Sequence, residues 1–432
     1  MAATQANQLV AVGIFLIMLI VILADWVDRT ITAWVGAMVM VAAGLAMNFY
    51  TQHQALAAVD FNTLGLLLGM MMLMSMLKDT GLFEALAVLA ARHSRGDPWR
   101  LLVLLAGLTA AVSTVLNNVT VIILIAPVTL SVTAMLKLNP VPFLVAEVLL
   151  SNLGGTATLI GDPPNTIIAS AAGFSFNAFL PILLPIVVAA YYPTLWCLRW
   201  AFADTWRMPS EVSALENLRP GSLIKNWASV VKLLAVLAIV IGLFTVQALV
   251  PLQPAYIAFI GVALAMILVP SNPGKMLQEV EWSILVFFAC LFVAVGGLES
   301  AGVMGAVARS LTDFAGSHLL TSAVLLIWIG AVLSCFVDNI PFTIAMVPVI
   351  KGLAADGVSV EPLWWALALG VGFGGNGTPI GASANLVAVA MSERAGYPIT
   401  IRTWVRSASL ATVVSCAVGT VVFLVIFGVF KR

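Results

Sequence analysis

The feature that most constrains this chain is an internal duplication of its polar segments. Residues 114–127 read TVLNNVTVIILIAP and residues 335–348 read CFVDNIPFTIAMVP, so Asn118 and Asn339 lie 221 positions apart. A second pair, GGTATLIGDPPN at 154–165 and GGNGTPIGASAN at 374–385, is offset by 220 positions. Polar segments duplicated within very apolar sequence are typical of transporters whose substrate site lies between two repeats.

The composition excludes an ordinary soluble domain. Hydrophobic residues make up 62% of the chain and charged residues 9%, whereas a soluble domain carries roughly 25% charged residues. Apolar runs of about 20 residues, the length that crosses a bilayer, recur from end to end. We therefore expect a multi-pass protein of the inner (plasma) membrane, surrounded by lipid. The formal net charge of zero gives no argument for nucleic acid as a partner.

The apolar runs predict an all-α polytopic membrane protein with two inverted repeats of five transmembrane helices, each with a hairpin and a broken helix. The predicted spans lie near 9–24, 31–49, 62–77, 143–170 (broken) and 177–200, and near 232–249, 255–270, 282–298, 363–391 (broken) and 408–429. An amphipathic stretch (82–96, 303–317) and a hairpin (101–136, 319–350) lie between the third and fourth spans of each half.

The same pattern divides the chain into two repeats and a linker. The N-terminal repeat, 1–201, consists of a scaffold at 1–100 and a transport part at 101–201, and 202–231 is expected to be a cytoplasmic linker. The C-terminal repeat, 232–432, consists of a scaffold at 232–318 and a transport part at 319–432. Five crossings per half is an odd number, so the second repeat must be inverted. With both termini outside, 15 of the 19 Lys and Arg residues fall on the cytoplasmic side, as the positive-inside rule requires.

Polar side chains gather at the two helix breaks and the two hairpin tips. Glycines and prolines break the helices there and expose backbone groups, which a membrane protein tolerates only where they are buried in protein or line a cavity. The alternatives are a proline kink used only for packing and, at the tips, capping and interhelical hydrogen bonding. The predicted substrate-binding residues are Asn117, Asn118, Thr120, Thr158, Asn165, Asn339, Thr343, Asn376, Thr378, Ser383 and Asn385.

Each half also contributes one acid to these motifs, Asp162 and Asp338, at positions that do not match. A carboxylate within a membrane is costly unless it is paired or binds a cation. Neither motif contains Lys or Arg, so we predict proton or cation coupling at both acids rather than a structural salt bridge. Glu147 is a weaker candidate, and Asp60 and Glu281 are expected at the membrane interface.

No pattern indicates an enzyme or a metal protein. The chain contains neither an H-E-x-x-H motif nor a recognisable pair of nucleophile and base, so no catalytic residue is expected. The four cysteines lie far apart and suggest neither a disulfide framework nor a metal site. We therefore expect no cofactor.

At these residues the chain resembles the ion transporter superfamily, most of all the branch of ArsB arsenite-efflux pumps, NhaD sodium–proton antiporters and the melanosomal P protein. The strings that carry the resemblance are NNVTVIILIAPVTL, SNLGGTATLIGDPPNTI, VDNIPFTIAMVP and GGNGTPIGASANL. The resemblance implies inverted repeats and alternating access by an elevator-like or local-gate motion. The related divalent anion/sodium symporters carry Ser-Asn-Thr at their tips. Here the tips read Asn-Asn-Val and Asp-Asn-Ile, and Asp338 would repel a dianion.

The resulting hypothesis is a secondary active transporter that exports arsenite or antimonite in exchange for protons. Arsenite is a small neutral trihydroxide at neutral pH, which amides, hydroxyls and backbone groups can bind and release, and the resemblance supplies this substrate. The alternatives are a sodium–proton antiporter, in which Asp162 and the tip amides hold Na⁺, a carboxylate transporter, and a channel. A soluble ATPase on the cytoplasmic linker is a further partner that the sequence permits, and the oligomeric state is left open.

Overall fold

The computed structural model describes residues 2–24, 26–207, 220–247, 249 and 252–430. Every regular element in these ranges is a helix, which confirms the predicted all-α class. The middle of the predicted linker, 208–219, lies outside the described residues.

The first half contains the predicted elements in the predicted order. The third predicted span is a single helix, α4, whereas the fourth is broken between α8 and α9. The helices are α1 (Ala2–Ala24), α2 (Arg29–Ala46), α4 (Phe61–Lys78), α5 (Leu82–Ser94), α6 (Pro98–Ser113), α7 (Asn118–Met135), α8 (Val141–Thr156), α9 (Pro163–Ala172), α10 (Phe176–Phe179) and α11 (Leu183–Ala201).

The second half repeats this order. A hairpin of α18 and α19 again precedes a helix that breaks, here between α20 and α21. The helices are α13 (Trp227–Thr245), α14 (Pro254–Leu268), α16 (Trp282–Ser300), α17 (Val303–Ser317), α18 (Leu319–Ser334), α19 (Asn339–Ala355), α20 (Glu361–Gly374), α21 (Ser383–Arg394), α22 (Ile401–Trp404) and α23 (Leu410–Val425).

The short helices α3 (Gln52–Ala58) and α15 (Pro273–Gln278) were not predicted. Both begin at a readable cap. Thr51 and Gln54 form a capping box at α3, and Asn272 accepts from two backbone amides at the start of α15. Such caps satisfy the amides that a helix start leaves free.

Seven of the described helices are long and apolar enough to cross a membrane, judged by length and composition. They are Gln5–Ile22, Arg29–Ala46, Phe61–Lys78, Asn118–Met135, Trp227–Thr245, Trp282–Ser300 and Ile401–Gly428. Further apolar helices, among them α8, α14 and α18, are shorter. The protein is thus a multi-pass membrane protein, while the full set of ten crossings stays a prediction.

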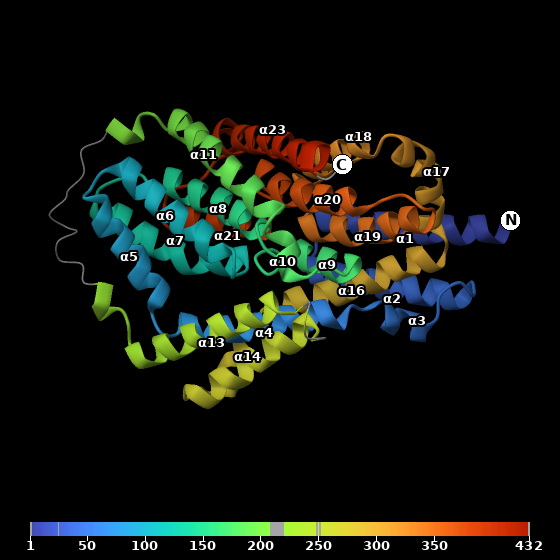
Figure 1. Cartoon of the computed structure of the whole chain (residues 1–432), viewed down its shortest axis with the longest axis horizontal. Helices are drawn as coiled ribbons and strands as arrows, with labels where there is room; N and C mark the ends of the chain where they lie inside the picture. Colours follow the sequence, from blue (N-terminus) through green and yellow to red (C-terminus); the bar gives the residue numbers. More distant parts are fainter. Residues whose placement is uncertain (1, 25, 208–219, 248, 250–251, 431–432) are drawn as a thin grey trace.

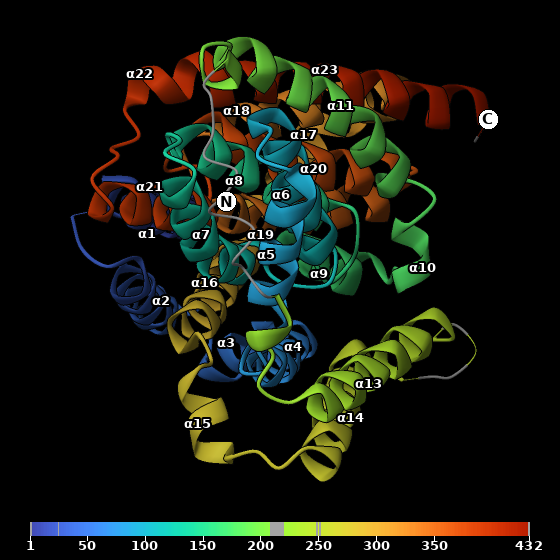
Figure 2. The same cartoon turned by 90° about the vertical axis from the view of Figure 1, so that its left-hand side faces the viewer.

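The helices form two layers (Figures 1 and 2). Helices α2, α3, α4, α13 and α14 lie on one side, and the hairpins and broken helices lie on the other, with α16 at the boundary. Small residues let helices of the first layer approach closely: a Cβ atom at Gly69 of α4 would lie 2.7 Å from the Cβ of Ala258 in α14. The division into scaffold and transport parts stays a prediction.

The two halves share a left-handed turn before their amphipathic helices. Gly81 has φ 79° and ψ 13°, and Gly302, 221 positions later, has φ 78° and ψ 12°. Their surroundings differ, because a Cβ atom on Gly81 would lie 2.1 Å from the carbonyl oxygen of Leu223, whereas one on Gly302 would have Gln8 Nε2 at 3.5 Å. The two turns thus share one backbone conformation, and the inverted repeat stays a prediction.

Each helix break packs directly against the hairpin of its own half. A Cβ atom on Gly161 would lie 2.4 Å from the Ser113 carbonyl oxygen at the end of α6. A Cβ atom on Gly381 would lie 2.8 Å from the Ser334 carbonyl oxygen at the end of α18. Only glycine allows backbone to approach backbone this closely, so these two residues permit the close packing of each break against its hairpin.

Candidate transport site

Two matching asparagines hold the helix breaks in shape. The Nδ2 of Asn165 donates to the carbonyls of Thr156 and Thr158 at 2.9 and 2.8 Å. The Nδ2 of Asn385 donates to two carbonyls of the second break at 2.8 and 2.9 Å. These bonds satisfy backbone acceptors that the interrupted helices leave free. The amide nitrogens of both predicted binding residues therefore serve the protein backbone.

Two matching threonines tie each break to its hairpin. The hydroxyl of Thr158 donates to the carbonyl of Thr114, and that of Thr378 donates to the carbonyl of Cys335. Thr343 is also occupied within the protein, because its hydroxyl donates to the Asn339 carbonyl at 2.7 Å. In this conformation the three hydroxyls bond to the backbone.

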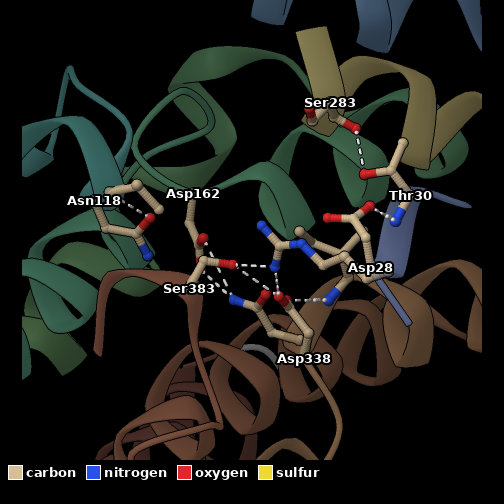
Figure 3. Close-up of polar contacts among 11 residues, drawn as sticks. Asp28, Thr30, Asn118, Asp162, Ser283, Asp338 and Ser383 are labelled. Carbon is tan, nitrogen blue, oxygen red and sulfur yellow. Dashed lines mark hydrogen bonds and ion pairs between the residues drawn. The ribbon is translucent and has the colours of Figure 1, made fainter. Parts of the chain in front are cut away.

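Between the tips and the breaks lies a small central cavity of about 20 Å³, which has room for about one water molecule. Figure 3 shows Asp162, Ser383 and Asp338 close together at this point. The polar residues that line the cavity are Arg29, Asn117, Asn118, Asp162, Asp338, Asn339 and Ser383. Six of the predicted site residues thus meet around one space, to which Ile284, Phe287 and Phe288 of α16 add an apolar wall.

Asp162 is buried at the start of α9, with 2% of its surface exposed. The Nδ2 of Asn339 lies 3.3 and 3.5 Å from its two carboxyl oxygens. Within the described part of the chain Asp162 makes no ion pair. Its carboxyl group therefore faces the cavity with an amide as its neighbour and no cation beside it.

Asp338 differs, because Arg29 pairs with it. The Nη1 of Arg29 lies 2.9 Å from Oδ2 of Asp338 and donates to Ser383 Oγ at 2.5 Å, while Ser383 Oγ donates to the same Asp338 oxygen at 2.9 Å. The prediction that no base lies near the two acids is thus wrong for Asp338. Arg29 begins α2, 309 positions away in sequence, so no local pattern could reveal the pair.

The central cavity therefore holds two carboxyl groups and one guanidinium. The guanidinium carbon of Arg29 also lies 5.7 Å from the centre of the Phe287 ring, a distance at which the ring face attracts a cation. If both acids are ionised, the formal charge of the cavity is one negative. Arg29 compensates Asp338, and Asp162 is the acid that remains without a counter-ion.

Asn152 of α8 was missed by the sequence interpretation. Its Nδ2 donates to Oδ1 of Asn376 at 2.7 Å and of Asn385 at 3.0 Å, and its Oδ1 accepts from Asn118 at 2.8 Å. It thus connects the first hairpin tip with the second break. The duplication does not flag it, because the matching position is Gly372, but a buried amide immediately before a break was a readable signal.

A larger cavity of about 120 Å³, the vestibule, adjoins the central cavity. Asn117 lines both cavities. The other polar or charged residues around the vestibule are Ser75, Lys78, Thr120, Thr166, Glu279 and Glu281. The predicted binding residue Thr120 thus lies in the vestibule, where its hydroxyl donates to Glu281 Oε1 at 3.2 Å.

Glu147 lies outside both cavities. It is 1% exposed in α8, Thr129 donates to one of its carboxyl oxygens, and the other oxygen has no hydrogen-bond partner among the described residues.

The chain matches the sequence model of the CitMHS family, described as citrate transporter, over residues 17–370. It is 37% identical over 421 residues to the uncharacterized transporter Rv2684 of Mycobacterium tuberculosis, covering 96% of this chain and 97% of that protein. It is 32% identical over 489 residues to the P protein of Homo sapiens, covering 94% of this chain and 58% of that protein.

Two solved structures share the fold. The YdaH transporter of Alcanivorax borkumensis superposes with a TM-score of 0.56 at 16% identity, covering 98% of both chains. MtrF of Neisseria gonorrhoeae, described among antimetabolite efflux pumps, superposes with a TM-score of 0.59 at 15% identity, covering 90% of this chain and 84% of its own. At these identities the likeness shows the fold alone.

Proposed function

The chain belongs to the CitMHS citrate transporter family of membrane transporters, and we propose that it is a proton-coupled secondary transporter in which Asp162 carries the proton. The observation that carries this proposal is the difference between the two acids of the central cavity. Asp338 is paired with Arg29, whereas Asp162 is buried beside an amide and has no counter-ion among the described residues.

A buried carboxylate without a counter-ion is unstable, and it gains stability by taking up a proton or a cation. Asp162 can therefore exist in two forms, protonated in the absence of a cation and ionised when the surroundings supply positive charge or water. Alternating access would couple this change to the movement of a solute. The predicted orientation, with both termini outside, would make the vestibule the cytoplasmic entrance.

The chemistry of the groups around the central cavity supports a small polar solute as cargo. The space of about 20 Å³ is bordered by three asparagine amides and one serine hydroxyl, groups that both donate and accept hydrogen bonds. We propose arsenite or antimonite, exported in exchange for protons. Each is a compact trihydroxide that such groups can bind without the thiolates that would hold it too tightly for turnover.

A carboxylate is the second candidate, and Arg29 is the observation that favours it. Its guanidinium side chain is 33% exposed, and a guanidinium binds carboxylates with two parallel hydrogen bonds. A carboxylate substrate would have to displace Asp338 from Arg29, and Asp338 would then need a proton. This route also couples the solute to protons, but through the other acid.

The test uses the full-length protein in liposomes that contain a pH-sensitive dye. Arsenite, citrate or Na⁺ is added to separate samples, and proton movement is followed with and without a protonophore. We expect arsenite-dependent proton movement in the wild-type protein. Asp162→Asn should abolish proton movement and keep arsenite exchange in the absence of a gradient, because an asparagine still hydrogen-bonds but cannot titrate.

The other outcomes separate the candidates. Proton movement with citrate, lost in Asp338→Asn, would replace arsenite by a carboxylate. Proton movement with Na⁺ alone would establish the sodium antiporter. Proton coupling that survives in Asp162→Asn would refute the role of Asp162, and solute flux that ignores the proton gradient would indicate a channel.

A further inference from the structure

Glu281 and Asp60 are matching residues of the two scaffold parts, 221 positions apart, and each lies at the N-cap of its helix. The carboxylate of Asp60 is fully engaged by its own helix. It accepts from the amides of Asn62 and Thr63 at 3.0 and 3.1 Å and from the Thr63 hydroxyl at 2.7 Å. Glu281 makes no such bond to the described backbone of α16.

Instead, the carboxylate of Glu281 reaches the transport part. Thr120, three positions beyond Asn117 at the first hairpin tip, donates to it at 3.2 Å. Glu281 is thus a scaffold acid in contact with the tip that borders the central cavity. An acid at this position could be explained by helix capping, but the Glu281 side chain does not cap the described backbone of α16.

Polar groups border both the vestibule and the central cavity, and one of them is shared by the two spaces. Glu281 and Thr120 line the vestibule, Asn117 lines both spaces, and Asp162 lines the central cavity. The vestibule of about 120 Å³ has room for several water molecules, and the central cavity for about one. Water in these two spaces can link the two carboxyl groups.

The charged groups that face Glu281 come from three elements. Arg29 of α2 and Lys78 of α4 act on its carboxylate, and Glu279 lines the same vestibule. Glu281 precedes the membrane-spanning segment Trp282–Ser300. Burial raises the pKa of Glu281 above the usual glutamate value, and the Thr120 hydrogen bond and the two cations oppose that rise.

We propose that Glu281 is the residue that passes the proton between Asp162 and the vestibule. In the conformation seen here the O–H bond of protonated Asp162 breaks as a water molecule in the central cavity takes the proton. Water passes the proton beyond Asn117 into the vestibule, where an O–H bond of protonated water breaks as one forms on Glu281. The proton then leaves to water in the vestibule, and no electrons are transferred. This inference rests on the proposed function, because it takes Asp162 to be the proton carrier.

The competing explanation is that Glu281 only tethers the hairpin tip to the scaffold. Variants separate the two roles. Glu281→Gln keeps an oxygen that accepts from Thr120 but cannot carry a proton, whereas Thr120→Val removes the tether and keeps the acid. Asp60→Asn is the matched control, because asparagine caps a helix as well as aspartate does.

The experiment measures two rates in liposomes, with arsenite as the probe: proton-coupled arsenite flux, and arsenite exchange without a gradient. We expect Glu281→Gln to lose coupled flux by about 100-fold, the scale of a lost proton-transfer group, with an altered pH profile and unchanged exchange. Asp60→Asn should keep both rates. Thr120→Val, which alters a predicted binding residue as well as the tether, should change coupled flux and exchange by the same factor. Unchanged coupled flux in Glu281→Gln, or a loss of coupled flux alone in Thr120→Val, would overturn the proposal.

A second readout keeps this test independent of the cargo. If wild-type protein moves no protons with arsenite, the proposed cargo fails, and infrared spectroscopy then tests Glu281 directly. The carboxylic-acid C=O bands of the purified protein in lipid are followed through a full pH titration. We expect Glu281→Gln to remove one titrating band that Asp60→Asn retains. An identical titration in wild type and Glu281→Gln would overturn the inference.

Discussion

Replacing Arg29 by methionine tests the asymmetry of the central cavity most directly. Methionine keeps the length of the side chain and its contact with Phe287 but removes the charge that pairs with Asp338. Exposed ion pairs contribute about 0–1 kcal/mol, and breaking a buried pair costs about 3–5 kcal/mol. The two side chains are 33% and 11% exposed, between these limits, and Ser383 still donates to Asp338. We therefore expect Arg29→Met to lower the free energy of unfolding by about 2 kcal/mol.

A double-mutant cycle isolates this contribution from other effects of the substitution. Asp338→Asn keeps the N-cap of α19, because asparagine also caps helices, and it leaves Arg29 unpaired but partly solvated. In the double variant neither residue of the pair carries a charge, so the double variant should be more stable than the sum of the single effects implies. The expected coupling energy is about 2 kcal/mol, within the range seen for contacting residues.

The assay is reversible unfolding of the purified protein in mixed micelles of a mild detergent and sodium dodecyl sulfate, at neutral pH. All four proteins of the cycle are compared in the same lipid and detergent. Single effects that add to within about 0.5 kcal/mol, the level of independent sites, would refute the reasoning. Asp338 would then not depend on Arg29, and the argument that Asp162 alone of the two acids in the central cavity lacks a counter-ion would fail.

The remaining predictions concern the two repeats and the buried acid. Gly81→Ala should destabilise the protein more than Gly302→Ala, because both pay about 1–2 kcal/mol for the left-handed backbone but only the first meets a backbone oxygen at 2.1 Å; equal losses on unfolding would contradict this. Asn165→Ala and Asn385→Ala should each cost about 1–3 kcal/mol per carbonyl left buried and unsatisfied, and a neutral effect on unfolding in either would show that its break does not need the amide. Glu147→Gln should leave arsenite-coupled proton movement in liposomes unchanged, since Glu147 lies outside both cavities; a loss of coupling would make it a further proton carrier.

Most helices were predictable from sequence because the signals are local. The hairpin tips lie at Asn117 and Asp338, and the breaks follow Thr156 and Gly374, where glycines, prolines and polar residues interrupt apolar runs. The family resemblance rested on the same segments, and the match to the P protein agrees with it. Six of the predicted site residues line the central cavity, because they come from duplicated polar motifs that lie close together in the fold.

The parts that escaped prediction are long-range contacts. Arg29 pairs with Asp338 across 309 positions, and the sequence around either residue does not indicate that the other lies beside it. Several residues predicted to bind substrate proved to be bonded to the backbone, as Thr343 is to Asn339. A hydroxyl or amide near a helix break can bind the transported solute or a backbone carbonyl. The sequence does not distinguish these two roles, because the outcome depends on the distance to a free carbonyl.

The duplicated positions and the unmatched positions have different roles in this site: the first bond to the backbone, and the second carry the charges. The matching residues Asn165 and Asn385 donate to the carbonyls of matching threonines, Thr158 and Thr378, so the duplicated positions shape the backbone of the site. The charges are unmatched: Asp162 corresponds to Ala382 and Asp338 to Asn117. A fully symmetric site would hold either no acid or equivalent pairs of acids, whose charges would compete for the same cation. Unequal copies, with Arg29 beside one acid only, leave one carboxyl group of the central cavity without a counter-ion among the described residues, and the proposed exchange of protons for a neutral solute would use that group.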